Sequence, residues 1–163
     1  MRVWVLALLV GYVGITTTVA AQGTTDGGRK AGPVEYQSPY GFCFSLPDDW
    51  RGFSIVQEHW DGFAPCSKGD CVITQGPLVR IQNPRCREAN SCQDIPIMVF
   101  TLKQWKSLGK FHVSAAPFPP NELGRNRKYV FALPARYNYG FLDGWEQVDR
   151  ILKDHPLHAP CSK

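Results

Sequence analysis

Hydrophobic and polar residues alternate in the stretch YGFCFSL, residues 40–46. Every second side chain there is aromatic or aliphatic, so in a strand these side chains share one face and Cys43 points to the other. Residues 47–49 (PDD) have the composition of a turn, and a second apolar run follows them. The pattern predicts an aromatic hairpin over residues 40–55 that opens the folded domain.

Short apolar segments later in the chain predict further strands. Residues 71–74 (CVIT) and 76–82 (GPLVRIQ) are β-branched and bounded by Gly, Pro and Asn, which is typical of strands. Residues 94–102 (DIPIMVFTL) form the longest apolar run after the N-terminal segment and lack alternation, which indicates a central strand covered on both faces. Residues 129–133 (YVFAL) predict another strand.

Two helices are predicted from the spacing of their first residues. Thr101 and Gln104 have the spacing of a capping box, which predicts a short middle helix. Asp143 and Glu146 have the same spacing at the start of an amphipathic segment. The apolar stripe of that segment consists of Trp145, Val148, Ile151 and Leu152. We expect this C-terminal amphipathic helix to pack on the sheet with Trp145 buried.

The order of these elements predicts the fold class. Strands come first, then the short helix, then more strands and the closing helix. Segregated strands and helices of this kind are typical of an α+β fold with a mostly antiparallel sheet.

The N-terminal segment predicts export. Residues 1–21 hold one Arg, an apolar core and a Val-Ala-Ala ending of small residues, which is the pattern of a signal peptide. Their densest apolar part, residues 3–15, is shorter than the roughly 20 residues that a membrane span needs, so no span is expected after cleavage. Residues 22–34 are rich in Gly, Thr and charge and are interpreted as a disordered leader. A single domain over residues 35–163 would remain, in a periplasmic or extracellular protein.

All six cysteines follow the predicted signal peptide. An even number in an exported chain indicates disulfide bonds, with every connectivity formally open. Short, turn-like intervals favour two local pairs, and the third follows by elimination. The predicted pairs are Cys66 with Cys71, Cys86 with Cys92, and Cys43 with Cys161.

A metal site is the alternative for the last of these cysteines. His155, His158 and Cys161 form a loose group of potential ligands near the C-terminus. The cysteine spacings do not match the paired pattern of structural zinc sites. We therefore favour a disulfide, and expect neither a metal nor another cofactor.

Few residues suggest catalysis. The sequence holds none of the common motifs for nucleophilic hydrolysis, zinc proteolysis or nucleotide binding. His59 and Asp61 share a face by parity, but an ordinary strand end is favoured over an acid–base pair. The net charge of +4 is too mild to single out nucleic acid or an anionic membrane. No catalytic residue is predicted.

One group of residues is a candidate ligand surface. Cations and aromatic rings come together here on the turns around the predicted strand 129–133. They would suit an anionic or carbohydrate ligand, although the favoured alternative is that their apolar stems cover the sheet edge. Export argues against nucleic acid as the partner. The residues are Arg125, Arg127, Lys128, Arg136, Tyr137 and Tyr139.

The opening YGFCFSLPDDW and the closing DGWEQVDRIL resemble the ends of the PsbP-like domains. This resemblance implies helices placed against an antiparallel sheet. Residues 36–157 also resemble uncharacterised bacterial exported proteins, through GRNRKYVFALPARYN and DIPIMVF. Neither resemblance transfers a catalytic motif.

The expected function is therefore binding rather than catalysis. We expect a non-enzymatic binding or accessory protein of the cell envelope, with an envelope protein or a carbohydrate as its partner. The alternative is a small secreted hydrolase whose site is assembled from residues distant in the sequence.

Overall fold

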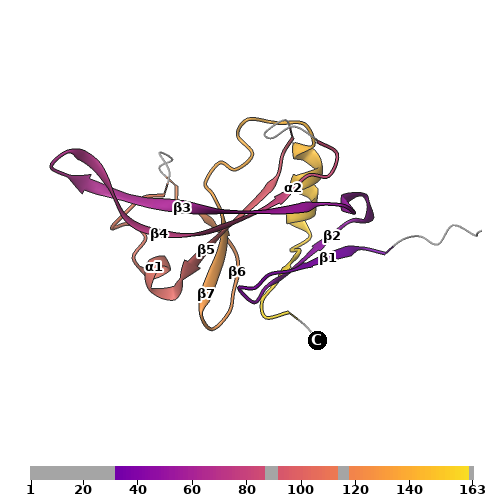
Figure 1. Ribbon diagram of the computed structural model, residues 1–163, viewed down its shortest axis with the longest axis horizontal. Coiled ribbons are helices and arrows are strands. Elements are labelled where there is room, and N and C mark those ends of the chain that lie inside the picture. The colour runs from indigo at the N-terminus through magenta and orange to yellow at the C-terminus, as the bar shows by residue number, and fades with distance from the viewer. Residues whose placement is uncertain (1–31, 87–91, 114–117, 162–163) are drawn as a thin grey trace, which may run out of the picture. The chain divides into compact units, whose positions relative to one another are not determined.

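The computed structural model describes residues 32–86, 92–113 and 118–161, all within one compact unit, Ala31–Lys163. The predicted signal peptide and residues 22–31 of the predicted leader lie outside this description. Two antiparallel sheets dominate (Figure 1). The smaller sheet has the order β1 (Val34–Gln37), β2 (Cys43–Leu46) and β8 (Leu157–His158). The larger has the order β3 (Ser54–Cys66), β4 (Gly69–Gln82), β5 (Ile95–Thr101), β7 (Tyr129–Leu133) and β6 (Asn121–Arg125).

Helices are few in this part of the chain. α1 (Leu102–Lys106) follows β5 directly, α2 (Trp145–Lys153) precedes β8, and a short 3-10 helix, η1 (Asp48–Trp50), follows β2. The prediction of a mostly antiparallel sheet is confirmed. The predicted capping box of α1 is also present, since Thr101 and Gln104 bond each other's backbone amides.

The predicted hairpin over residues 40–55 is wrong. β2 pairs with β1, with Phe44 opposite Tyr36, while the apolar run after the turn belongs to β3 in the other sheet. The chain changes sheets because η1 and Gly52, at a φ of +89°, redirect it between β2 and β3. β1 begins at Val34, so the last residue of the predicted leader is part of a strand.

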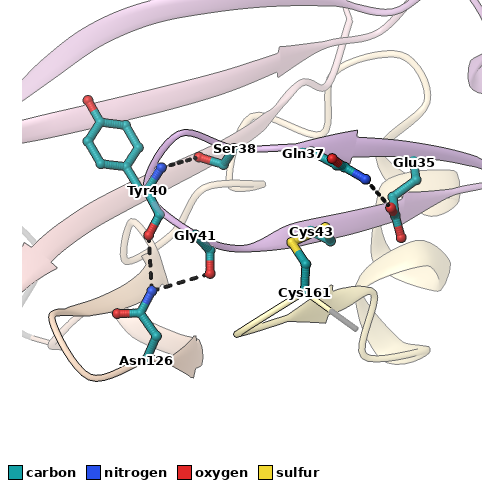
Figure 2. The surroundings of a disulfide bond; sticks show 8 residues. All are labelled: Glu35, Gln37, Ser38, Tyr40, Gly41, Cys43, Asn126 and Cys161. Carbon is teal, nitrogen blue, oxygen red and sulfur yellow. Dashed lines mark hydrogen bonds between the residues drawn. A yellow bond between two sulfur atoms is a disulfide. The ribbon is translucent and has the colours of Figure 1, made fainter. Parts of the chain in front are cut away.

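The alternation in β2 is nevertheless as predicted. Phe42, Phe44 and Leu46 are buried in the core, and Cys43 points the other way, toward Cys161 (Figure 2). Alternation therefore identified the buried face of this strand, although not its neighbour.

β3 and β4 form one long hairpin, in place of the two short strands predicted over residues 71–82. The expected break at Gly76 is absent because this glycine lets the Trp60 ring lie against the β4 backbone. A Cβ at position 76 would come within 2.4 Å of that ring. Gly76 is thus a site of close packing rather than a turn.

The larger sheet is buried on both faces near β5, as the lack of alternation predicted. Ile95, Ile97 and Val99 point into one cluster, whereas Met98 and Phe100 point into another. The first, the main core, lies between the two sheets and includes α2; its buried members are Phe42, Phe44, Leu46, Trp50, Val79, Ile81, Ile95, Ile97, Val99, Phe131, Leu133, Val148, Ile151 and Leu157. The second core consists of Trp60, Met98, Phe100, Phe111, Val130 and Ala132.

The start of α2 differs from the sequence expectation. Its N-cap is Gly144 in the left-handed conformation, with no side-chain cap bond, so the predicted capping role of Asp143 is wrong. Val148 and Ile151 enter the main core, but Trp145 is only half-buried and packs edge-to-face on Phe141 at 5.0 Å. Trp145 stays near the surface because it occupies the first turn, where the helix leaves the exposed loop.

Three disulfide bonds are present, in the predicted pairing. Cys66–Cys71 spans the end of the β3–β4 hairpin, and Cys86–Cys92 closes a short loop before β5. Cys43–Cys161 joins β2 to the C-terminal segment, with Cα atoms 5.1 Å apart across 118 residues of sequence (Figure 2).

Candidate functional site

The residues of the predicted ligand surface do not come together. Arg125, Arg127 and Lys128 lie at or just beyond the end of β6, whereas Arg136 and the two tyrosines follow β7. The strand between the two groups has five residues, and at about 3.3 Å per residue it separates them by roughly 17 Å. The prediction of one continuous surface is wrong because neighbours in sequence lie at opposite ends of a strand.

The first group surrounds a turn that is anchored to the smaller sheet. Asn126 donates from Nδ2 to the carbonyls of Tyr40 and Gly41 (Figure 2). Its Oδ1 accepts from the amides of Lys128 and Tyr129. Arg125 pairs with Glu122, Nε to Oε1 at 2.6 Å. The hydrogen bond and charge of Glu122 raise the pKa of Arg125 above its ordinary value. This cation is therefore engaged within its own hairpin.

The second group belongs to the segment between β7 and α2. The guanidinium of Arg136 lies 4.8 Å from the centre of the Tyr139 ring, and both residues are exposed. Tyr137 instead packs against the main core. Burial, and secondarily the charge of Asp149, raises the pKa of Tyr137. The group is therefore divided between a surface pair and a core-side tyrosine.

A cleft of about 500 Å³ is the better candidate site. It opens between the smaller sheet and α2, in a region that the sequence did not single out. Its apolar wall combines aliphatic side chains with three prolines from separate segments, Pro33, Pro47 and Pro156. Its polar residues are Ser45, Asp49, Gln147, Arg150, Asp154 and His158.

The secondary structure explains why these polar residues meet. Ser45 alternates with the buried residues of β2, and its amide donates to the carbonyl of Pro156 at 2.9 Å. Gln147, Arg150 and Asp154 recur at helical spacing on the side of α2 that faces the cleft. Such spacing was the one signal in the sequence that could have indicated part of this site.

Asp49 connects the walls of the cleft. Its Oδ2 accepts from Gln147 Nε2 and, at 2.7 Å, from Arg85 Nη2. The Oε1 atom of Gln147 is buried and has no hydrogen-bond partner among the described residues. A ligand that reached this atom with an N–H donor would satisfy it.

The polar residues of the cleft do not form a catalytic constellation. Among the residues that the structure describes, Ser45, Asp154 and His158 make no hydrogen bonds with one another, as activation of a serine nucleophile requires. His59 and Asp61 approach within 3.8 Å, but His59 is largely exposed and stands outside the cleft.

The alternative metal ligands are also dispersed. Cys161 is joined to Cys43, and His158 faces the cleft. In the described ranges, no three His, Cys, Asp or Glu side chains come together as metal ligands. Within those same ranges, no helix has the length and hydrophobicity that a membrane crossing requires.

No family model, curated protein or solved structure matches the chain. The similarity to the PsbP-like group therefore stays a prediction.

Proposed function

We propose that this protein is an exported, non-enzymatic binding module of the cell envelope whose ligand site is the cleft between the smaller sheet and α2. The observation that carries the proposal is a preformed cleft that combines an apolar wall with polar side chains from separate elements, as binding sites commonly do. Three disulfide bonds support an oxidising compartment. The proposal includes a PsbP-like arrangement, with α2 as the amphipathic helix packed on the sheet.

The proposed ligand is an extended peptide segment of an envelope protein. The proline-rich wall is rigid and apolar, so it loses little conformational entropy when it binds such a segment. Arg150 can pair with a carboxylate of the ligand, and Asp154 can pair with a cation of the ligand. Among the described residues that line the cleft there is no Phe, Tyr or Trp ring on which a sugar would stack.

Peptide-library selection tests this proposal. Peptides selected on the exported protein should lose binding to Ser45→Arg, which fills the cleft, and to Arg150→Glu, which reverses its cation. Arg127→Glu is the matched control, because Arg127 is an exposed cation outside the cleft. Peptides that bind all four proteins equally would contradict the assignment.

A hydrolase is the second candidate, because Ser45, Asp154 and His158 line the same cleft. Ester, peptide and phosphate substrates distinguish the two functions. Turnover that falls with both Ser45→Ala and His158→Ala would favour the hydrolase, whereas peptide binding without turnover supports the binding module.

A further inference from the structure

β3 is the outermost strand of the larger sheet in the described part of the chain, so one of its sides borders no other strand of that sheet (Figure 1). Among the described residues, only His112 pairs with this outer side, as an antiparallel bridge to Phe63. The outer side of such a strand presents a row of backbone N–H and C=O groups with which another strand can pair. We call the outer side of residues 55–61 the β3 edge; none of these residues lines the cleft.

The bridge to His112 shows which backbone groups of β3 face outward. Phe63 donates from its amide to the His112 carbonyl at 2.7 Å and accepts from the His112 amide at 2.8 Å. Backbone groups alternate sides along a strand, and the alternation is unbroken here, because Trp60 and Ala64 both reach the second core. The outward N–H and C=O groups therefore belong to every second residue before Phe63. These residues are Asp61, His59, Gln57 and Ile55.

The neighbouring strand supports this assignment independently. Pro77 of β4 lies opposite His59, and a proline has no amide hydrogen to donate to the His59 carbonyl. The pairing leaves no hydrogen bond of the β3–β4 ladder unmade only if the backbone groups of His59 point away from β4. Both observations thus place the N–H and C=O groups of His59, and of the residues that alternate with it, on the outer side.

The β3 edge differs from the other sheet edges of the described chain. β6, on the opposite side of the larger sheet, has five residues and an irregular register between Glu122 and Gly124. The outer strands of the smaller sheet, β1 and β8, have four and two residues. Proteins protect sheet edges by such short or bulged strands and by proline or lysine side chains. Residues 55–61 have none of these features, so this edge is open to a strand.

The side chains of the β3 edge indicate which strand would fit. Ile55 is half-buried against the main core, so an apolar residue opposite it would extend that contact. Glu58 is already paired with Arg80, at 2.7 Å. Asp61 approaches only His59 within ion-pair distance among the described residues, at 3.8 Å. A lysine opposite Asp61 would therefore supply a cation that the described chain does not place there.

We propose that the β3 edge is a docking surface for an extended strand of another protein, with an apolar side chain opposite Ile55 and a cation opposite Asp61. The strand runs antiparallel to β3, in the direction of the existing bridge at Phe63. Main-chain hydrogen bonds supply the affinity and the side chains the specificity, as in other proteins that add a strand to a sheet edge. A second copy of the same edge would supply no such cation, because residues 55–61 contain neither lysine nor arginine.

Amide hydrogen exchange of the exported protein, with its disulfides formed, tests the proposal. The probe is a peptide with blocked ends, Lys-Val-Thr-Lys-Thr-Val-Val, which places lysine opposite Asp61 and valine opposite Ile55. In the free protein the outward amides of the β3 edge should exchange faster than those of Val56, Glu58 and Trp60, which face β4. The peptide should slow the outward set alone, about tenfold when roughly nine-tenths of the protein is bound.

Methylation of the peptide backbone provides a matched control. N-methyl groups on the first, third, fifth and seventh residues of the peptide remove the amides that would donate to β3. This peptide should bind at least about tenfold more weakly. N-methyl groups on the second, fourth and sixth residues lie on the side that faces away from β3, so they should change the affinity little.

Two protein variants give a second readout. Gln57→Pro removes one outward amide but no bond to β4, and should weaken the binding of the unmethylated peptide at least about tenfold, whereas Gln57→Ala retains the amide and should not. Asp61→Lys needs no change of backbone, and should favour the peptide in which glutamate replaces both lysines.

Four results would overturn the proposal. They are a peptide that does not bind, equal binding of the two methylated peptides, slowed exchange on α2 instead of β3, and protection of the outward amides by self-association without any peptide. The last of these would place a second copy of the chain on the edge. Because the β3 edge lies outside the cleft, each result is independent of the proposed function.

Discussion

The two cores of the domain are assembled in different ways. The main core takes residues from both sheets and from α2, so its members extend from Phe42, directly before β2, to Leu157 in β8. The second core comes from the β3–β4 hairpin, β5, β7 and Phe111, and α1 packs against its edge. The main core therefore forms only when segments from the two ends of the domain come together. The second core depends instead on close packing between neighbouring strands.

Each core has a buried tryptophan, and the two differ in their hydrogen bonding. Trp60 donates from Nε1 to the Val99 carbonyl at 3.0 Å and packs on the Phe100 ring at 4.4 Å. Trp50, fully buried in the main core, has no partner for its Nε1 among the described residues. The buried tryptophan of the second core therefore has a hydrogen-bond partner for its Nε1 among the described residues, whereas that of the main core has none.

The largest expected effect is loss of the disulfide that closes the main core. Replacing both Cys43 and Cys161 by Ser should lower the free energy of unfolding by about 5 kcal/mol, because the bond closes a long loop. Replacing Cys66 and Cys71 by Ser should cost only about 2 kcal/mol. Urea unfolding of both variants measures the difference. If the two double variants lost the same free energy of unfolding, the link between the two ends of the domain would not be what distinguishes the main core from the second.

A glycine substitution tests close packing in the second core. Gly76→Ala should destabilise the protein by about 2–3 kcal/mol, because its Cβ would overlap the Trp60 ring. Gly32→Ala is the control, since nothing lies within 4 Å of its Cβ. Urea unfolding should show little change for the control. Two equally stable variants would show that the hairpin can move away from Trp60.

Phenylalanine at the two tryptophan positions tests the difference in hydrogen bonding. Both changes remove ring volume, but only Trp60→Phe removes a hydrogen bond, whereas Trp50→Phe also removes an unpartnered N–H. Trp60→Phe should therefore cost about 1–2 kcal/mol more than Trp50→Phe. Thermal melts of the two variants give the comparison, and the reverse order would contradict it.

The sequence predicted which side of a strand is buried better than it predicted which strand lies beside it. Alternation in β2 gave its buried side correctly, but period two says nothing of which strand pairs with it, so β2 was assigned to β3 instead of β1. In α2, Val148 and Ile151 are buried in the main core, whereas Trp145, at the helix end, is only half-buried. Local disulfides were predictable because short loops close readily.

The candidate sites were harder to predict. The cleft joins residues from η1, from α2, from β2 and β8 and from segments next to these strands, so no local motif contains it. Arg125 and Tyr139 were grouped because they are close in sequence, yet β7 separates them. The segment between β7 and α2 was noticed only through Arg136 and the tyrosines. Its exposed Phe141 depends on a left-handed backbone that composition does not indicate.

The smallest expected effect is a loss of stability at alkaline pH, which we assign to a tyrosine beside the main core. Tyr137 borders the main core, and its pKa is raised in the folded protein, mainly by burial, above the ordinary value of 10.0. The folded state therefore holds this proton more tightly than the unfolded chain. Below a pH of about 10 both states are protonated and the stability is complete, and as pH rises through the folded pKa that stability is lost.

Tyr137→Phe removes this titration. The variant should lose less stability than the original protein when the pH is raised from about 8 to about 11. Tyr139→Phe is the control, because Tyr139 is exposed in the segment between β7 and α2. Urea unfolding at the two pH values provides the measurement. The second core has no tyrosine among its described members, whereas Tyr36, Tyr40 and Tyr129 border the main core as Tyr137 does. An alkaline loss that is undiminished in Tyr137→Phe would contradict the assignment to Tyr137.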